Sequence, residues 1–430
     1  MIKFNIWSLG SLIIAAIVLL PIIALFWMAF TPSENIWPHL ISTTLPRYAS
    51  NSAILMLSVG ALSAAMGTGS AFLMVMYRFP GQKWLQWALL LPLAVPAYIG
   101  AYALVDFLEY AGPVQTSLRS LFGWQNARDY WFPEIRSVFF AVIVLSASLY
   151  PYVYLMTRSA LEEQSGNSYE VARALGAGPI ASLMRVAIPL ARPAIAAASA
   201  IVMMEVVSDF GTSDFFAVQT LTTGIFTIWL DANNAAGAAQ IACLILIVVL
   251  TLLGLEKGSR RNMRLAGSAR NARPISKNTI HGAKGYILFA LCFIPFFIGF
   301  LLPFSVILWN ASKSTIGWAG DGLSQALLNT LFTGGMAAAI TVLAALFLVY
   351  GVRLSQSTTA RTLLPATTIG YAAPGAVLAV GILIPFAWAD NRLADLILSL
   401  TGTDPGLLLT GTSFALILAF CIRFFAIAQG

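Results

Sequence analysis

Residues 167–190 read NSYEVARALGAGPIASLMRVAIPL, a polar stretch between two long apolar runs. Asn167 and Glu170 have the spacing of a capping box, in which each side chain satisfies a backbone N–H of the other. A short helix is therefore expected to begin here. Gly176 predicts its end near Leu175, because glycine adopts the left-handed turn that closes many helices.

A second short helix is expected after this turn. Gly178 and Pro179 prevent the first helix from continuing, since proline lacks the N–H that the hydrogen-bond ladder needs. The second helix is predicted to run from Ile180 to about Pro189, with Pro193 opening the next apolar helix. The whole stretch thus predicts a stiff helix–turn–helix elbow.

The surrounding sequence is that of a membrane protein. Of its 430 residues, 59% are hydrophobic and 10% are charged, whereas soluble domains have about 25% charged residues. Apolar runs of roughly 20 residues, each sufficient to cross the bilayer as a helix, recur along the chain. The sequence therefore predicts an all-α polytopic membrane protein with about ten spans, at residues 9–30, 53–76, 85–107, 137–157, 193–211, 237–255, 285–308, 326–350, 363–388 and 411–429.

Two features near the spans have ordinary explanations. The apolar run that follows Lys3 is too long for a signal peptide, so it is interpreted as a retained first span. Cys243, Cys292 and Cys421 all lie within apolar runs and are too scattered for a metal site or a disulfide framework. They are expected to be small core residues.

The net charge of +7 is explained by how the protein is oriented in the membrane. If the N-terminus is cytoplasmic and the spans alternate, 18 of the 24 Lys and Arg residues fall on the cytoplasmic side, which is the positive-inside pattern. Nucleic-acid binding is not expected. The residues on the opposite side are Arg47, Arg119, Arg128, Arg136, Lys313 and Arg392.

The chain repeats itself in parallel. Leu20-Pro21 matches Leu302-Pro303 at an offset of 282 positions, and Asn51 matches Asn329 at an offset of 278. Pro96 and Pro374 are likewise 278 positions apart. The predicted organisation is a first transmembrane half at residues 1–256, a basic cytoplasmic linker at 257–284, and a second transmembrane half at 285–430.

The second half is expected to be incomplete. Arg423-Phe424-Phe425 corresponds to Tyr152-Val153-Tyr154 at an offset of 271, which would place the counterpart of Glu170 at position 441. We therefore expect the second half to lack its own elbow and last two spans, and the sequence to be a truncated form of a twelve-span protein.

The elbow resembles the "EAA" coupling loop of permease subunits in type I ABC importers. Its matching positions and their neighbours are Glu170, Val171, Ala172, Arg173, Gly176, Ala177, Gly178, Val186, Ile188 and Pro189. The family pattern has Ala, Ile and Leu at positions 171, 186 and 188, which are conservative differences. The resemblance implies that the loop docks on a separate ATPase subunit.

Flanking motifs resemble those of the fused two-half bacterial ferric-iron permeases. They are YPYVYL at 150–155, EVVSDFGTSD at 205–214 and TTGI at 222–225. This resemblance implies ferric iron as cargo, although thiamine and phosphonate permeases share the layout. It also implies a bacterial inner-membrane location, two copies of an ABC ATPase that carry ATP and Mg²⁺, and a periplasmic or lipid-anchored substrate-binding protein. The chain has no G-x-x-x-x-G-K-[ST] motif, so it is expected to bind no cofactor and to catalyse no reaction itself.

Oxygen-bearing side chains that could line the cargo pathway gather near one end of the fifth span. Glu205 and Asp209 share a helix face, Asp214 follows, and Tyr98 and Tyr102 are four residues apart on the third span. Carboxylate and phenolate oxygens suit a hard ferric ion. Glu205 fits a structural hydrogen bond equally well, and Asp209 and Asp214 fit solvated interface residues or contacts to the binding protein better.

Two other classes remain open. An ion-gradient-driven secondary transporter would need ionisable residues deep in several spans, and Glu205 is the main candidate. A membrane-embedded enzyme would need clustered His, Cys or carboxylate residues, and the sequence shows no such cluster.

Overall fold

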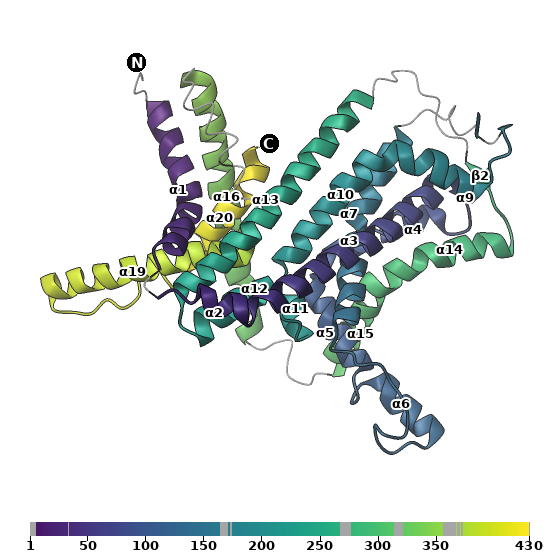
Figure 1. The fold of residues 1–430 in the computed structure, drawn as a ribbon, viewed down its shortest axis with the longest axis horizontal. Helices are drawn as coiled ribbons and strands as arrows, with labels where there is room; N and C mark the ends of the chain where they lie inside the picture. The colour runs from purple at the N-terminus through teal and green to yellow at the C-terminus, as the bar shows by residue number, and fades with distance from the viewer. Residues whose placement is uncertain are drawn as a thin grey trace. The chain divides into compact units, whose positions relative to one another are not determined.

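The chain is helical almost throughout in a computed structural model, which describes residues 6–32, 34–163, 171–172, 174–266, 277–313, 321–355, 367, 370 and 373–429. It divides into two compact units. Unit 1 comprises residues 1–46, 221–250 and 315–430, and unit 2 comprises residues 47–220 and 251–314. The all-α prediction is confirmed (Figure 1).

Unit 2 holds most of the first predicted half. Its strands pair in parallel, with Tyr77 opposite Asn278, and form a two-stranded sheet. Its elements are α3 (Leu45–Met76), β1 (Tyr77–Arg78), α4 (Gln82–Ala88), the 3₁₀ turn η1 (Leu91–Ala94), α5 (Ala97–Leu108), α6 (Pro113–Phe122), α7 (Val138–Glu162), α9 (Pro179–Ser182), the π turn η2 (Leu183–Ala187), α10 (Ile188–Ser208), α11 (Gly211–Phe215), β2 (Asn278–Thr279), α14 (Ala283–Phe296), the π turn η4 (Phe297–Leu301) and α15 (Leu302–Lys313).

Unit 1 combines the first helix of the chain with the last ones. Its elements are α1 (Ile6–Phe30), α2 (Trp37–Ser42), α12 (Leu221–Phe226), the π turn η3 (Thr227–Asp231), α16 (Asp321–Ser355), α19 (Gly375–Thr401) and α20 (Ser413–Gln429). The long helix α13 (Ala235–Ala266) contributes residues to both units.

Eight described helices are long and apolar enough to cross a membrane by themselves. They correspond to eight of the ten expected runs, and the tenth run forms the 17-residue helix α20. The ninth run, predicted at 363–388, is displaced along the chain: its helix is Gly375–Thr401, because Pro374 is extended and precedes the first turn. The third run, predicted at 85–107, is not one straight helix. Its two parts, Gln82–Ala94 and Ala97–Phe122, meet at an angle of 95°. Val95 is extended and precedes Pro96, and the proline ring disfavours the helical conformation of the residue before it.

The first helix of each predicted half packs against helices of the other half. Within unit 1, α1 packs against α16, α19 and α20, and within unit 2, α15 packs against α5. The two arrangements correspond under the repeat. Gly381 of α19 lies against the backbone oxygen of Pro21, while a side chain at Gly100 of α5 would meet the ring of Pro303. The compact units therefore differ from the predicted halves, and the boundaries at 256 and 284 stay predictions.

The repeat is also visible in the backbone. Pro96 and Pro374 each precede the first turn of a helix, with φ and ψ of −54° and 139° in one case and −55° and 152° in the other. A proline in this position sets the entry angle of the helix that follows. The prolines at an offset of 278 thus occupy equivalent places in α5 and α19.

Candidate functional site

The elbow forms the glycine turn that its sequence predicts. Val171, Ala172 and residue 174 are helical, and the N–H of Leu175 donates to the oxygen of Val171 over 3.0 Å. Gly176 then adopts a φ of +80°, and the N–H of Ala177 donates to the oxygen of Ala172 over 3.0 Å. This six-residue closure is the Schellman motif, which ends a helix with a left-handed glycine.

Part of the predicted loop lies outside the described residues. The structure does not describe Glu170 and Arg173, nor Asn167, Ser168 and Tyr169. The capping box at the start of the elbow therefore stays a prediction.

The second arm differs from its prediction. It begins at Pro179, but it does not end near Pro189, because α9, η2 and α10 together form a 29-residue span from Ile180 to Ser208. The π turn η2 ends two residues before Pro189, just as η4 ends two residues before Pro303. A wider turn accommodates the proline ring and the missing N–H without breaking the helix. Pro193 accordingly lies within α10.

The outer face of the elbow is apolar and exposed. We call Val171, Leu175, Ile180 and Met184 the elbow patch; their exposed fractions are 58%, 83%, 76% and 61%. The Ile180–Ser208 span would be about 43 Å long at 1.5 Å per residue, against about 30 Å of hydrocarbon. The span is therefore longer than the hydrocarbon is thick. Exposed apolar side chains gathered on one face are typical of an interaction surface.

The inner face of the second arm is fixed to the helical core. Ala187 is buried, and Leu183 and Val186 pack against the same cluster as Tyr150 and Tyr154 of α7. The hydroxyl of Tyr150 donates to the oxygen of Leu89 over 3.0 Å in the segment before the bend at Pro96. The second arm is thus packed on α7, which is itself hydrogen-bonded to that segment.

The three acidic residues at the end of α10 and in α11 differ in their surroundings. Asp209 accepts hydrogen bonds from the N–H and hydroxyl groups of both Thr212 and Ser213, over 2.9 to 3.4 Å. Burial raises the pKa of the Asp209 carboxyl, while these hydrogen bonds act in the opposite direction. Asp209 therefore caps α11, whereas Asp214 is exposed and Glu205 is partly buried.

The two predicted tyrosines face the same short helix. Gly211 of α11 lies next to Tyr98, and the ring of Tyr102 meets that of Phe215 at a centroid distance of 6.2 Å. Tyr98 and Tyr102 are 51% and 42% exposed. The fold thus brings α5 and α11 together. Among the described residues, however, no three His, Cys, Asp or Glu side chains form a group that could hold a metal ion.

Sequence reasoning missed a cation that joins these elements. Arg136 pairs with Glu109 over 3.0 Å, donates to the backbone oxygen of Phe215 over 3.0 Å, and lies 5.2 Å from the centre of its ring. Its partners are 27 and 79 residues away in sequence. No local pattern marks such a residue.

Residues 56–257 match the family described as "Binding-protein-dependent transport system inner membrane component". The match covers the elbow, α7 and α10, and it confirms the resemblance to type I ABC importer permeases. A multi-pass location in an inner membrane agrees with both the family and the apolar helices.

Several permeases are similar to the chain. The Fe(3+)-transport system permease protein FbpB 2 of Haemophilus influenzae is 25% identical over 78% of this chain and 63% of its own length. The ferric transport system permease protein FbpB of Actinobacillus pleuropneumoniae is 24% identical over 98% of this chain and 62% of its own length. The molybdenum transport system permease protein ModB of Escherichia coli is 26% identical over 48% of this chain and 89% of its own length. The chain thus spans just under two thirds of the length of the ferric relatives.

Proposed function

We propose that this chain is the membrane subunit of an ATP-driven importer, and that the elbow transmits the ATPase stroke to the spans. The observation that carries the proposal is the two-faced geometry of the elbow. Its outer side exposes the elbow patch, and its inner side is packed on α7. An element with one exposed apolar face and one rigidly anchored face can receive force from a partner and pass it on.

The proposed partners are two copies of an ATPase subunit and one substrate-binding protein. ATP and Mg²⁺ would be held by the ATPase subunits, because this sequence has no phosphate-binding glycine loop. The N-terminus would lie on the cytoplasmic side. Closure of the ATPase pair would move the elbow and open the pathway on the side of the binding protein. Hydrolysis would then restore the inward-open state.

Ferric iron is the proposed cargo. Similarity to one ferric permease extends over 98% of the chain. Tyr98 and Tyr102 of α5 carry phenol groups, and Asp214 of α11 carries a carboxylate. These are hard oxygen donors, which a ferric ion prefers. Thiamine and phosphonates are the competing cargoes.

A secondary transporter driven by a proton gradient would need a buried carboxylate to carry the proton. Asp390 of α19 is fully buried, but its oxygens accept hydrogen bonds from the N–H groups of Leu408, Leu409 and Thr410 and from the hydroxyl of Thr410. A carboxylate with this many donors holds a loop in place. It is therefore poorly suited to exchanging a proton during transport.

The cargo is tested by uptake into vesicles that contain the full-length protein, its ATPase and its binding protein. With ATP present, labelled ferric iron should accumulate at least about tenfold faster than labelled thiamine, molybdate or 2-aminoethylphosphonate, because oxyanions and organic cations lack the preference for carboxylate and phenol oxygens. Faster uptake of any competitor would overturn the iron assignment.

A further inference from the structure

A pocket lined by three cationic side chains lies in unit 2, next to the end of α3. Its volume is about 610 Å³, and Arg78, Lys83 and Lys277 line it together with the amides of Gln82 and Gln86. None of the described residues that line it is acidic. We call this the basic pocket. Its volume and its charge suit a small anionic group such as a phosphate, which guanidinium and ammonium groups bind through charged hydrogen bonds.

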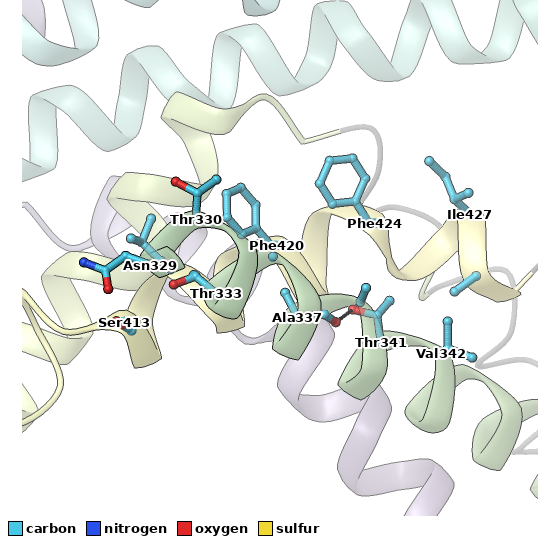
Figure 2. A pocket seen from close by; sticks show the side chains of 14 residues that line it. Asn329, Thr330, Thr333, Ala337, Thr341, Val342, Ser413, Phe420, Phe424 and Ile427 are labelled. Atoms are coloured by element: carbon cyan, nitrogen blue, oxygen red, sulfur yellow. Dashed lines mark hydrogen bonds between the residues drawn. The ribbon is translucent and has the colours of Figure 1, made fainter. Parts of the chain in front are cut away.

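The charge of the basic pocket distinguishes it from a larger groove in unit 1. That groove is lined by α16 and α20 and has a volume of about 1010 Å³. Figure 2 shows Thr330 and Thr333 of α16 on one side and Phe420 and Phe424 of α20 on the other. No charged side chain among the described residues lines it. The groove therefore has no group that would select an anion, whereas the basic pocket has three.

The pairing of the two strands brings the cations of the basic pocket together. Arg78 belongs to β1, and β2 begins directly after Lys277. The strands pair with Arg78 opposite Thr279, and the N–H of Ile280 donates to the backbone oxygen of Arg78 over 2.8 Å. Lys83 follows in the first turn of α4. Residues far apart in the sequence are thus held around one small volume by backbone hydrogen bonds.

The positive charge of the basic pocket exceeds what its surroundings balance. Neither ion pair among the described residues involves Arg78, Lys83 or Lys277. Burial lowers the pKa of the Lys277 ammonium, and the neighbouring Arg158 lowers it further. Glu162 acts in the opposite direction, but it is already paired with Arg158 over 2.9 Å, and Arg78 adds to the repulsion. A bound anion would relieve this repulsion.

Lys277 also has a structural contact, which leaves it able to bind a ligand. Its Nζ donates to the backbone oxygen of Met74 over 2.9 Å, and Nε2 of Gln82 donates to the same oxygen over 2.7 Å. Met74 lies in the last turn of α3, where backbone oxygens have no partner within the helix. The ammonium of Lys277 carries three N–H groups, so this contact leaves two of them for a ligand.

An aromatic surface leads from the basic pocket along a membrane span. Trp84 lines the pocket, and its ring lies 6.4 Å from that of Phe293, which in turn lies 6.1 Å from that of Phe297. Trp84 and Phe297 are 52% and 40% exposed. Both phenylalanines belong to the span Ala283–Lys313. An acyl chain can lie along these rings while an attached phosphate reaches the cations, whereas a free phosphate would leave the rings uncovered.

We propose that the basic pocket binds the phosphate group of an anionic phospholipid. Arg78, Lys83 and Lys277 contact the phosphate oxygens, and the acyl chains lie along Trp84 and Phe297. Basic side chains at the end of a membrane span are a recurring arrangement for binding anionic headgroups. This site is independent of the cargo and of the ATPase.

The bound lipid would stabilise the support of the elbow. Phe79 lines the basic pocket and belongs to the same buried cluster as Ala187, against which Leu183 and Val186 of the second arm pack. A phospholipid that joins β1, β2 and α4 therefore fastens one side of that cluster. Because it binds the folded state, it should raise the unfolding temperature of the chain.

The first test measures lipid binding by the full chain in detergent. In native mass spectrometry, the chain should bind phosphatidylglycerol more tightly than phosphatidylcholine, whose headgroup has no net charge. The variant Arg78→Gln/Lys83→Gln/Lys277→Gln should bind phosphatidylglycerol about 100-fold more weakly, since each cation near an anionic headgroup contributes about fivefold. Arg78→Gln alone should weaken binding about fivefold. This single variant leaves the contact between Lys277 and Met74 in place.

The matched control is Lys257→Gln/Lys284→Gln/Arg353→Gln. It removes the same charge from exposed side chains that do not line the basic pocket, so phosphatidylglycerol should bind as it does to the unchanged chain. Equal losses of binding in the two triple variants would show attraction to overall charge and would overturn the proposal. Unchanged binding in the variant of the pocket would overturn it as well.

The second test separates a phospholipid from a free phosphate. Phosphatidylglycerol should raise the unfolding temperature of the unchanged chain, and this increase should be lost in the triple variant of the pocket. Equal concentrations of glycerol 1-phosphate or inorganic phosphate should have little effect, because neither covers the aromatic surface. Trp84→Ala should weaken phosphatidylglycerol binding several-fold, since Trp84 is the ring that lines the pocket. If inorganic phosphate stabilises the chain as much as phosphatidylglycerol does, the assignment to a lipid is wrong.

Discussion

Replacing Gly176 with proline is expected to slow ATP-driven uptake by about 100-fold or more while the protein remains inserted in the membrane. Gly176 has a φ of +80°, and proline fixes φ near −65°, so the left-handed turn cannot form. The hydrogen bond from Ala177 to Ala172 that closes the elbow would be lost with it. A penalty of about 3 kcal/mol in the active geometry corresponds to roughly a 100-fold effect.

The matched control is Gly178→Ala. Both glycines have open space around them, but Gly178 lacks the positive φ, so its substitution should leave the uptake rate nearly unchanged. Gly176→Ala should fall between the two, because a left-handed alanine costs about 1–2 kcal/mol. Initial rates are compared at equal amounts of membrane-inserted protein. Normal uptake by Gly176→Pro would show that the elbow does not transmit the ATPase stroke.

Replacing Gly67 with leucine is expected to destabilise the helical core of unit 2. A methyl group on Gly67 would lie 2.6 Å from Cβ of Val153 and 2.8 Å from the backbone nitrogen of Tyr154. The obstacle is partly backbone, which cannot rotate away, so α3 and α7 would have to separate. Overpacking of this kind costs about 1–3 kcal/mol for small groups and more for a larger side chain. The unfolding temperature of the protein in detergent measures the effect.

Gly69→Leu on the same helix is the control. A Cβ atom at Gly69 would meet nothing within 4 Å, so the unfolding temperature should change little. Equal losses at positions 67 and 69 would indicate that glycine itself, rather than the close contact with α7, is required in α3.

The long-range architecture was predictable where hydropathy alone decides it. The apolar runs located the spans, and the repeat located the equivalent Pro96 and Pro374. The break at Val95 was missed because the run from 85 to 107 is apolar throughout, and hydropathy is blind to backbone direction. The π turns before Pro189 and Pro303 were missed because they alter the ladder without altering composition.

The candidate site was predictable only in its local part. Gly176 was identified from sequence because a helix-ending glycine depends on its own neighbours. The elbow patch and the capping role of Asp209 depend on which side chains the fold leaves exposed or brings close. Arg136 joins elements far apart in sequence, so a single sequence contains no sign of its role.

The central claim is that ATP hydrolysis on a separate subunit drives transport through this chain. The most direct measurement is the initial rate of labelled ferric iron uptake in vesicles with the full-length protein, the ATPase subunits and the binding protein. The account predicts uptake with ATP, and none with a proton or sodium gradient alone. Uptake driven by a gradient in vesicles that lack the ATPase would contradict it.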